Sequence, residues 1–508
     1  MSAVAKVEAE ARPRLVEVAI VGAGFGGLCL AIKLLEAGTR DFVILEKDTE
    51  VGGTWRDNQY PGAECDVQSH LYSYSFEGKA DWSQRYAGWK EIQQYILDTT
   101  EKHGLRPYIR FGQQVDGAHF DEKSGRWTVH LRSGATLAAR HFVMATGPLH
   151  VPQMPDIKGL DRFRGKVFHS ARWDHAYDLT GKRVASIGTG GSAIQYCPEI
   201  APRVQTLHVF QRTAAWVIPR DTRTYSEGAK RRFARHPWRR KLHRARLYWT
   251  NESRVWPIFH AGLSWIFEAY ARFHLRRQVN DPELARRLTP DYKIGCKRVL
   301  VSNTWFPMFN RPNVELVTDG IREVTERGIV TNDGVERAVD CIVLGTGFVT
   351  DPRTYMRGFP ITGLPGHSLA EDWKAGAEAY YGVSVSGYPN LFQLVGPNTG
   401  LGHNSIIFMI EAQARYVVEC LRELKARDAD YMVVDAAEQR RFNDRVQRAL
   451  QGTVWNSGCK SWYQSADGRN FTIWPWSTWR YWLATRKVRA ERYRFGHVEP
   501  ANAPASGR

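Results

Sequence analysis

One order of segments occurs twice along the chain: a short, mainly apolar segment, a glycine-rich turn that opens a helix, and a second short, mainly apolar segment. In the first copy the apolar run 16–21 precedes a glycine-rich turn, a stripe within 28–35, and the run 42–45. Apolar positions at i, i+3, i+4 and i+7 make one face of a helix, and short apolar runs are typical of strands buried in parallel sheets. The pattern therefore predicts a strand–helix–strand unit of a doubly wound α/β fold.

The turn of this first copy has the sequence Gly22-Ala-Gly-Phe-Gly-Gly27, and the second apolar run ends at Glu46. Glycines let the backbone approach a pyrophosphate, and the helix that follows presents its N–H groups to it. A carboxylate at the end of the second strand accepts from ribose hydroxyls. The first copy is predicted to bind a dinucleotide.

The second copy consists of a predicted strand at 183–187, the turn 188–193, which opens a helix, and a predicted strand at 206–210; both strands are mainly apolar. Ala193 replaces the third glycine of the motif, and a small residue there still permits close packing of helix on strand. A second dinucleotide site is expected.

Counting along both copies separates the two nucleotides. Glu46 lies 24 positions after Gly22, and Arg212 lies 24 positions after Gly188. An acid would repel a 2′-phosphate, whereas a guanidinium pairs with it through two hydrogen bonds. The second site is therefore predicted to bind NADPH, with Arg212 and Thr213 on the 2′-phosphate; the alternative is an ordinary surface arginine.

With 508 residues the chain is too long for one core, so two or three domains are expected. The net charge of +17 raises the question of nucleic acid or an anionic membrane as partner. The densest basic block, 230–246, is interpreted as a solvated helical face, because charge runs alone are weak evidence. We expect no nucleic-acid partner and no stable membrane insertion, since no run approaches the ~18 apolar residues of a membrane span.

The cysteines have no paired spacing, which argues against a disulfide framework and against a zinc site. We expect no bound metal and a reducing, cytoplasmic location. The cysteines are Cys29, Cys65, Cys197, Cys296, Cys341, Cys420 and Cys459.

The stretch 163–174, between the two glycine turns, carries Phe163, Gly165, His169, Trp173 and Asp174. It resembles the fingerprint F-x-G-x-x-x-H-x-x-x-W-[P/D] of the type I Baeyer–Villiger monooxygenases, and we expect it in the linker between the two domains. The resemblance implies FAD, NADPH, O2 and a ketone as reactants. It implies insertion of oxygen next to the carbonyl through a C4a-peroxyflavin, giving an ester or lactone, NADP+ and water.

Further motifs support the resemblance. Gly52-Gly-Thr-Trp55 looks like a flavoprotein monooxygenase pattern and marks the first dinucleotide as FAD. For Trp55 and Tyr72 core packing is the alternative, and for Asp66 a surface turn. The resemblance places these residues at FAD: Gly22, Gly24, Phe25, Gly27, Glu46, Gly53, Thr54, Trp55, Asp66, Tyr72 and Val115. It places these at NADPH: Glu64, Cys65, Asp66, Thr189, Gly190, Gly191, Ser192, Ala193, Gln195, Arg212, Thr213, Lys297 and Arg298.

Lys297-Arg298, followed by Phe-Asn-Arg at 309–311, resembles the segment that carries the family's essential arginine. The resemblance makes Arg298 catalytic, with Asp66 orienting it. A permanent cation stabilises negative charge on oxygen, and arginine does not give up its proton. From the residues alone Arg298 would be taken as a structural ion-pair residue. His169 is expected to bond to backbone, with general-base catalysis as the alternative.

The predicted architecture is α/β, with two doubly wound Rossmann-like dinucleotide-binding domains and a discontinuous FAD domain. The expected order is a disordered tail (1–13), the first segment of the FAD domain (14–150), an NADPH domain (151–339) with a helical insertion at about 222–288, the second segment of the FAD domain (340–490) with a C-terminal substrate loop, and a tail (491–508). We expect the insertion to help roof the substrate site, and the protein to be a monomer or weak homo-oligomer.

Three rival functions share features of this pattern. A flavin monooxygenase acting on nitrogen or sulfur has both glycine turns, but Trp173-Asp174 and Arg298 favour the Baeyer–Villiger reaction. A disulfide reductase needs a dithiol beside the flavin, and only Cys65 follows Gly52 in that segment. An NADPH-sensing flavoprotein without catalysis is the third rival.

Overall fold

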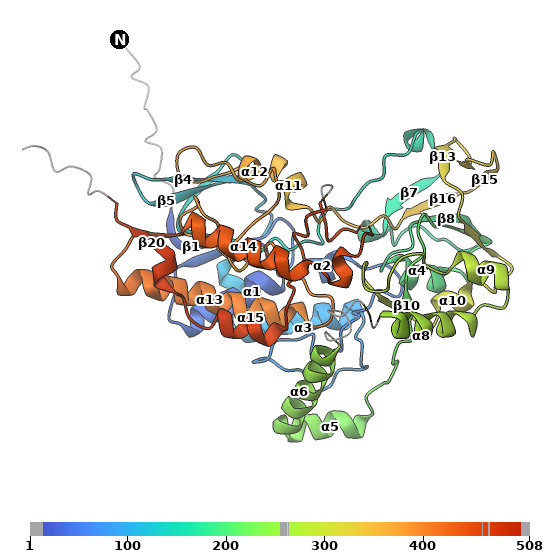
Figure 1. Ribbon diagram of the computed structural model, residues 1–508, viewed down its shortest axis with the longest axis horizontal. Helices are drawn as coiled ribbons and strands as arrows, with labels where there is room; N and C mark the ends of the chain where they lie inside the picture. Colours follow the sequence, from blue (N-terminus) through green and yellow to red (C-terminus); the bar gives the residue numbers. More distant parts are fainter. Residues whose placement is uncertain (1–13, 255–261, 263, 460, 466–467, 499–508) are drawn as a thin grey trace, which may run out of the picture.

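The computed structural model describes residues 14–254, 262, 264–459, 461–465 and 468–498. The chain forms two lobes, each built on one large sheet (Figure 1). The sheet of the first lobe is mixed, because β4–β5 and β5–β6 pair antiparallel, and the sheet of the second lobe is parallel. The first lobe takes in 14–150 and the residues after 344, and the second lobe lies between them. The predicted tail 1–13 lies outside the described residues.

The sheet of the first lobe has the order β17-β4-β5-β6-β1-β2-β3, with β18 also paired to β6. Residues of β1 alternate between two cores: Val18 and Ile20 face the helices, and Ala19 and Val21 face the other side. The strands are β1 (Leu15–Val21), β2 (Phe42–Leu45), β3 (Ile109–Arg110), β4 (Val115–Asp121), β5 (Arg126–Leu131), β6 (Thr136–Met144), β17 (Ile361–Thr362) and β18 (Leu391–Gln393).

Helices α1 and α13 pack against each other on one face of this sheet, and both are amphipathic with the apolar stripe inward. The helices of this lobe are α1 (Phe25–Glu36), α2 (Thr54–Asp57), α3 (Trp89–Lys102), α11 (Pro352–Tyr355), α12 (Leu369–Asp372), α13 (Ile406–Ala426), α14 (Ala436–Leu450) and α15 (Thr478–Ala484).

The sheet of the second lobe is parallel, in the order β12-β9-β8-β16-β7. Its strands are β7 (Lys166–His169), β8 (Arg183–Ile187), β9 (Thr206–Phe210), β12 (Val314–Val317) and β16 (Cys341–Leu344). Beside it lie α4 (Ala193–Ile200), α10 (Trp305–Met308), the pair β10 (Val217–Ile218) and β11 (Leu300–Val301), and the antiparallel strands β13 (Ile321–Val324), β14 (Gly328–Thr331) and β15 (Glu336–Ala338).

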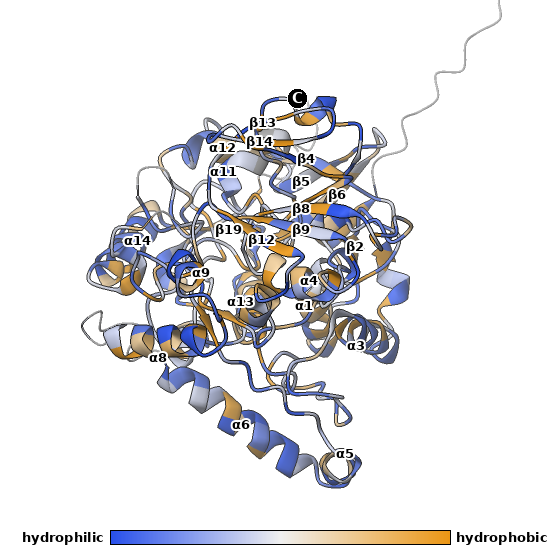
Figure 2. Ribbon diagram, turned by 90° about the vertical axis from the view of Figure 1, so that its right-hand side faces the viewer, coloured by the Kyte–Doolittle hydropathy of each residue, from blue (hydrophilic) through white to orange (hydrophobic). Residues whose placement is uncertain are grey.

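The insertion consists mainly of helices in its described part, as predicted. It contains α5 (Glu227–Arg235), α6 (Pro237–Ser253), α8 (Ser264–Arg276) and α9 (Pro282–Arg287). Helices α5 and α6 project away from both lobes as an arm (Figures 1 and 2). We call residues 227–253 the helical arm.

Three boundary predictions are wrong. Strand β16 pairs with β7 and β8, so the chain leaves the second lobe after residue 344 and not at 340. The stretch 163–174, expected as a linker, provides β7 at the edge of the second sheet. Residues from 491 are not all tail, because β20 (Tyr493–Gly496) pairs antiparallel with β19 (Tyr431–Val434).

The expectation of no disulfide is also wrong. Cys296 and Cys459 are joined, across 163 positions of sequence. Spacing along the chain could not reveal this pair, because the fold alone brings the two segments together. The other cysteines, all among the described residues, are free and buried. No helix in the described ranges is long and apolar enough to cross a membrane.

Candidate functional site

A pocket of about 810 Å³ lies where the carboxyl ends of strands from both sheets meet. Its wall includes the ends of β1, β2 and β6 from the first lobe, and the turn after β8 from the second. Ligands of doubly wound folds bind at this edge of the sheet. The two crossings between the lobes run side by side, since Pro152 and Phe348 form an antiparallel bridge.

The first glycine turn is shaped by close packing. A Cβ on Gly22 would lie 2.7 Å from the carbonyl oxygen of Ala145, and a Cβ on Gly27 would lie 2.0 Å from that of Gly22. Gly24 has more room around it. A Cβ placed on Gly24 would lie 3.8 Å from the Cα of Gly53, which would be its nearest neighbour within the described chain. The turn therefore leaves an open cradle at Gly24, where a diphosphate fits against the start of α1.

Glu46 is buried, with 4% of its surface exposed. Its Oε2 accepts from the backbone N–H of Ala23 at 2.8 Å, and its Oε1 accepts from Asp48 N and Arg56 Nη1, each at 3.1 Å. A carboxylate offers about four acceptor positions, so one remains for a ribose hydroxyl. The sequence did not identify Arg56 as a site residue, because nothing in its sequence neighbourhood distinguishes it from other arginines.

Trp55 and Tyr72 both line the pocket and pack on the core of the first lobe. Trp55 Nε1 donates to the hydroxyl of Tyr72 at 3.1 Å, and the two rings meet edge to face at 5.7 Å. Phe25 meets Tyr72 at 5.5 Å. Core packing and a place in the pocket wall are thus compatible for both residues. The pocket wall also contains Gly53, Thr54 and Val115.

The second glycine turn repeats the first. Gly188 has a φ of +110°, and a Cβ there would lie 2.4 Å from the carbonyl oxygen of Gly345. No described heavy atom lies within 4 Å of a Cβ placed on Gly190, so this turn also has an open cradle. Ala193 begins α4 and is fully buried. The wall of the pocket contains Gly191 and Ser192.

The residues predicted to bind the 2′-phosphate lie close together: Arg212 and Thr213 follow β9, and Lys297 lies near them. Burial, and then the charge of Arg212, lowers the pKa of Lys297. Thr189 donates from its hydroxyl to the carbonyl of Thr213 at 3.1 Å, which ties the glycine turn to this segment. Two neighbouring cations suit a doubly charged 2′-phosphate. In the described chain, Arg212, Thr213 and Lys297 do not belong to the pocket wall itself.

Arg298 and Asp66 meet in the pocket wall. Nε of Arg298 donates to Oδ2 of Asp66 at 3.0 Å, and Nη2 donates to the same oxygen. The charge of Asp66 raises the pKa of Arg298 above its usual range. The Arg298 side chain is 45% exposed, and because it lines the pocket we take this exposure to open into the cavity. Burial raises the pKa of the neighbouring Tyr463 to about 12, against the pull of the Arg298 charge.

A hydrogen-bond network joins the lobes beside this pair. Tyr60 donates from its hydroxyl to Oε1 of Gln195 at 2.9 Å, and Nε2 of Gln195 donates to the carbonyl of Glu64 at 3.0 Å. The carboxylate of Glu64 pairs with Arg220. No motif in the sequence marks Arg220, so it could not be predicted as a site residue. The neighbouring Cys65 thiol is buried in the pocket wall, and burial raises its pKa.

The fingerprint residues lie outside the pocket wall in the described chain. Nδ1 of His169 accepts from the backbone N–H of Ala171 at 3.1 Å, as expected. Burial lowers the pKa of His169 to about 4, so the ring is neutral near pH 7. Trp173 packs against Phe168 and Tyr196 and is partly buried. This placement, at the edge strand beside the return crossing, argues against a general base.

Phe163 and Asp174 complete the fingerprint. A Cβ on Gly165 would lie 2.5 Å from the Phe163 ring and from the carbonyl oxygen of Asp340, which explains the glycine. Asp174 pairs with Lys166 at 2.5 Å. The helical insertion, expected to roof the site, contributes no described residue to the pocket wall. The helical arm, 227–253, likewise provides no described residue of this wall.

Comparison with known proteins shows which proteins the chain is similar to. The family model described as flavin-binding monooxygenase-like matches residues 16–359. A Baeyer–Villiger monooxygenase of Pseudomonas aeruginosa is 46% identical, covering 95% of this chain and 92% of the relative. One of Streptomyces coelicolor is also 46% identical, covering 96% and 94%.

The chain is also similar in structure to solved monooxygenases. An oxidised steroid monooxygenase bound to NADP superposes with a TM-score of 0.86 at 30% identity, over 95% of this chain and all of that one. A cyclohexanone monooxygenase of Rhodococcus bound to NADP+ gives 0.87 at 26% identity, over 96% of this chain and all of that one. Another structural relative is a complex with both FAD and NADP.

Proposed function

The chain belongs to the flavin-binding monooxygenase-like family and, within it, to the Baeyer–Villiger monooxygenases, and from this premise we propose the division of labour among its residues. The reaction is insertion of one oxygen atom of O2 next to the carbonyl of a ketone, with NADPH as reductant. The observation that carries the proposal is the guanidinium of Arg298, held by Asp66 in a pocket that both glycine turns line.

When bound, NADPH would supply a hydride to FAD, and the reduced flavin would activate O2, which is the source of the inserted oxygen atom. The turn from Gly22 to Gly27 holds the FAD diphosphate, and Glu46 holds its ribose. The turn from Gly188 to Ala193 holds the NADPH diphosphate, with Arg212 and Lys297 on the 2′-phosphate. The open cradles at Gly24 and Gly190 support this assignment.

Arg298 is proposed as the catalytic residue. A nucleophilic oxygen that adds to a ketone leaves negative charge on the former carbonyl oxygen, and a fixed cation stabilises that charge as it develops. Arginine suits this position because it stays charged and cannot protonate the nucleophile. Asp66 holds the guanidinium by two hydrogen bonds to one oxygen, so the remaining N–H groups are available to the pocket.

Glu64 and Gln195 are proposed to position NADPH between the lobes. Both belong to the network that crosses from the first lobe to α4, and both line the pocket. Arg220 holds the carboxylate of Glu64, which keeps that charge from repelling the coenzyme. The buried Tyr463, on the segment tied down by the Cys296–Cys459 disulfide, helps to exclude water near Arg298.

The direct test uses the purified, FAD-loaded protein with NADPH and a panel of linear, cyclic and steroidal ketones. Ketone-dependent NADPH oxidation with a matching yield of ester or lactone, detected by gas chromatography, is the expected result. A thioether and a tertiary amine run in parallel test the rival oxygenation of sulfur or nitrogen. If no ketone accelerates NADPH oxidation and hydrogen peroxide is the sole product, the proposed reaction is wrong.

A cytoplasmic location and the absence of a macromolecular substrate belong to the same proposal. Five of the seven cysteines are free and buried, which fits a reducing compartment, whereas the Cys296–Cys459 disulfide is of a kind that is rare there. Ultracentrifugation of the loaded protein tests the expected monomer or weak homo-oligomer.

A further inference from the structure

Helix α6 presents an apolar stripe to solvent. Trp238, Leu242 and Trp249 are 58%, 63% and 59% exposed, and Ala245 between them is exposed as well. Their spacing of i, i+4, i+7 and i+11 places all four on one face of the helix. The stripe of a globular helix normally faces the core, so this arrangement is inverted. Single exposed apolar residues are common, whereas an aligned row marks a contact surface.

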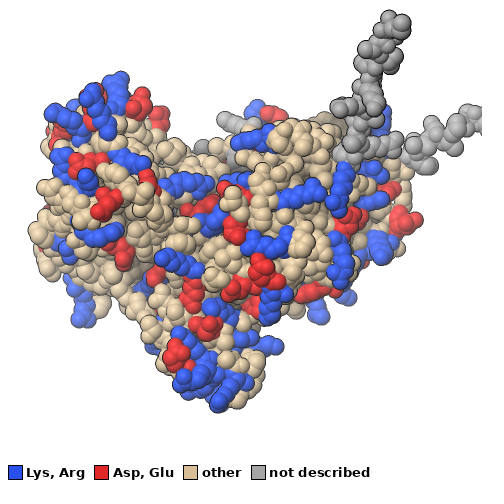
Figure 3. All heavy atoms as spheres, turned by 180° about the vertical axis from the view of Figure 1, so that it is seen from behind, with Lys and Arg blue, Asp and Glu red and all other residues tan. Residues whose placement is uncertain are grey.

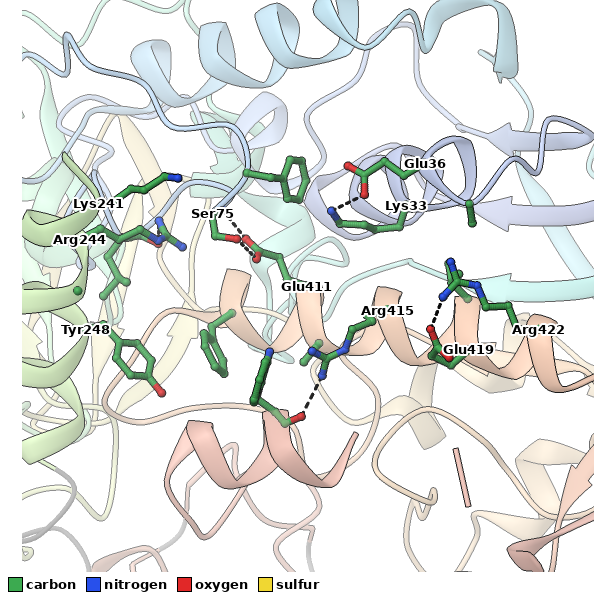
Figure 4. A pocket seen from close by; sticks show the side chains of 18 residues that line it. Lys33, Glu36, Ser75, Lys241, Arg244, Tyr248, Glu411, Arg415, Glu419 and Arg422 are labelled. Carbon is green, nitrogen blue, oxygen red and sulfur yellow. Dashed lines mark hydrogen bonds and ion pairs between the residues drawn. The ribbon is translucent and has the colours of Figure 1, made fainter. Parts of the chain in front are cut away.

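The helix is held so that this face points outward. Nη1 of Arg244 donates to the carbonyl of His70 at 2.7 Å, and the hydroxyls of Tyr248 and Thr478 lie 2.9 Å apart. One flank of α6, which carries Arg244, Ala245 and Tyr248, borders a pocket of about 640 Å³ beside the stripe (Figure 4). These contacts anchor the arm to the first lobe, so the stripe is a fixed feature of the surface.

Positive charge surrounds the stripe. The helical arm, 227–253, contains nine Lys and Arg residues against Glu227 and Glu252, and Glu252 is buried. Basic side chains crowd this projection in the space-filling view (Figure 3). Within the described chain none of its exposed cations has a carboxylate within 4.0 Å. The exposed cations are Arg231, Arg232, Arg235, Arg239, Lys241 and Arg246.

This combination favours one class of partner. Two copies of the chain joined through their stripes would bring two sets of unpaired cations together, which is repulsive. A nucleic acid would use the cations but not a row of Trp and Leu on a convex helix. An anionic bilayer uses both, since Trp settles at the level of the headgroups and Lys and Arg bind the lipid phosphates.

We propose that the helical arm docks on anionic lipid bilayers, with the apolar stripe of α6 in the headgroup layer and its exposed Lys and Arg on lipid phosphates. The association is peripheral and reversible, because a single amphipathic helix of this length lies on a membrane and does not cross it. The bilayer is engaged by a segment that contributes no described residue to the pocket wall, so docking and oxygenation are separable.

The test measures co-sedimentation of the full-length, FAD-loaded protein with sucrose-loaded vesicles. We expect binding to vesicles of phosphatidylglycerol and phosphatidylcholine at 50 mM NaCl, and about tenfold or more weaker binding to pure phosphatidylcholine or at 500 mM NaCl. A duplex DNA of mixed sequence is added as a competitor. NADPH oxidation of every variant serves as the check on folding.

Two double variants separate the two contributions. Trp238→Ser with Trp249→Ser removes the apolar contact, and Arg231→Glu with Arg235→Glu reverses charge on α5; each is expected to weaken binding about tenfold or more. The matched control, Arg322→Glu with Arg327→Glu, makes the same change in net charge on the second lobe, far from the arm, and is expected to leave binding within about twofold.

Four results would overturn the proposal. They are no binding to anionic vesicles, equal loss in the control variant, unchanged binding after loss of both tryptophans, and displacement from vesicles by DNA at equal phosphate. A dimer that the tryptophan variant converts to monomer, without vesicle binding by the parent protein, would assign the stripe to a second copy of the chain.

Discussion

Replacing Arg298 by methionine tests the proposed chemistry most directly, because the change keeps the length of the side chain and removes the charge. The guanidinium lies within hydrogen-bonding distance of Asp66 and opens into the pocket. Unit charges about 4 Å apart at an effective dielectric of about 20 interact by about 4 kcal/mol. Loss of one donor to a developing oxyanion costs about 2.7–4 kcal/mol, or about 10²–10³ in rate. Since the side chain is 45% exposed, we expect the lower end of this range.

The assay compares two steps in one protein. Anaerobic reduction of the bound flavin by NADPH, followed by stopped-flow absorbance, is expected to stay within about threefold, while ester formation falls about a hundredfold or more. NADPH oxidation then continues with release of hydrogen peroxide. Arg311→Met, at an exposed arginine outside the pocket wall, is the matched control. Ester formation at the parental rate would refute the role, and a parallel loss of flavin reduction would reassign Arg298 to NADPH binding alone.

Three further outcomes are expected. Arg212→Ala raises the KM for NADPH about 10- to 100-fold and leaves the KM for NADH nearly unchanged, since a charge-assisted pair with the 2′-phosphate is lost; equal shifts for both coenzymes would contradict this. Cys459→Ser, which opens the bond to Cys296, destabilises the fold by about 2–5 kcal/mol, seen as a lower Tm in non-reducing buffer that merges with the parental Tm in dithiothreitol. Burial lowers the pKa of His169 from 6.5 to about 4, so its contribution to stability is full above pH 6.5 and is lost as the pH falls from there to 4, by up to about 3 kcal/mol. Urea unfolding between pH 7 and 4 should show this slope, and His169→Gln should flatten it.

The positions of individual strands and helices could be predicted from the sequence alone. The strands β2, β8 and β9 have the predicted limits, and β1 and α1 differ from theirs by few residues, because backbone period and glycine turns act over short distances. The register of Glu46 and Arg212 likewise follows from counting, since each comes just after the second strand of its unit. Both nucleotide sites could therefore be predicted before any contact was known.

Tertiary structure decided how distant segments meet. Arg298 and Asp66 are 232 positions apart, and Cys296 and Cys459 are 163 apart, so neither pair leaves a trace in local spacing. The assignment of β16 to the second sheet and of residues 493–496 to a strand also depends on partners far along the chain. Periodicity shows that α6 has an apolar face, but which face is buried depends on how the lobes pack around it. The sequence determines which faces of each helix or strand are apolar, polar or charged. Tertiary packing determines which of those faces is buried and which residues it contacts.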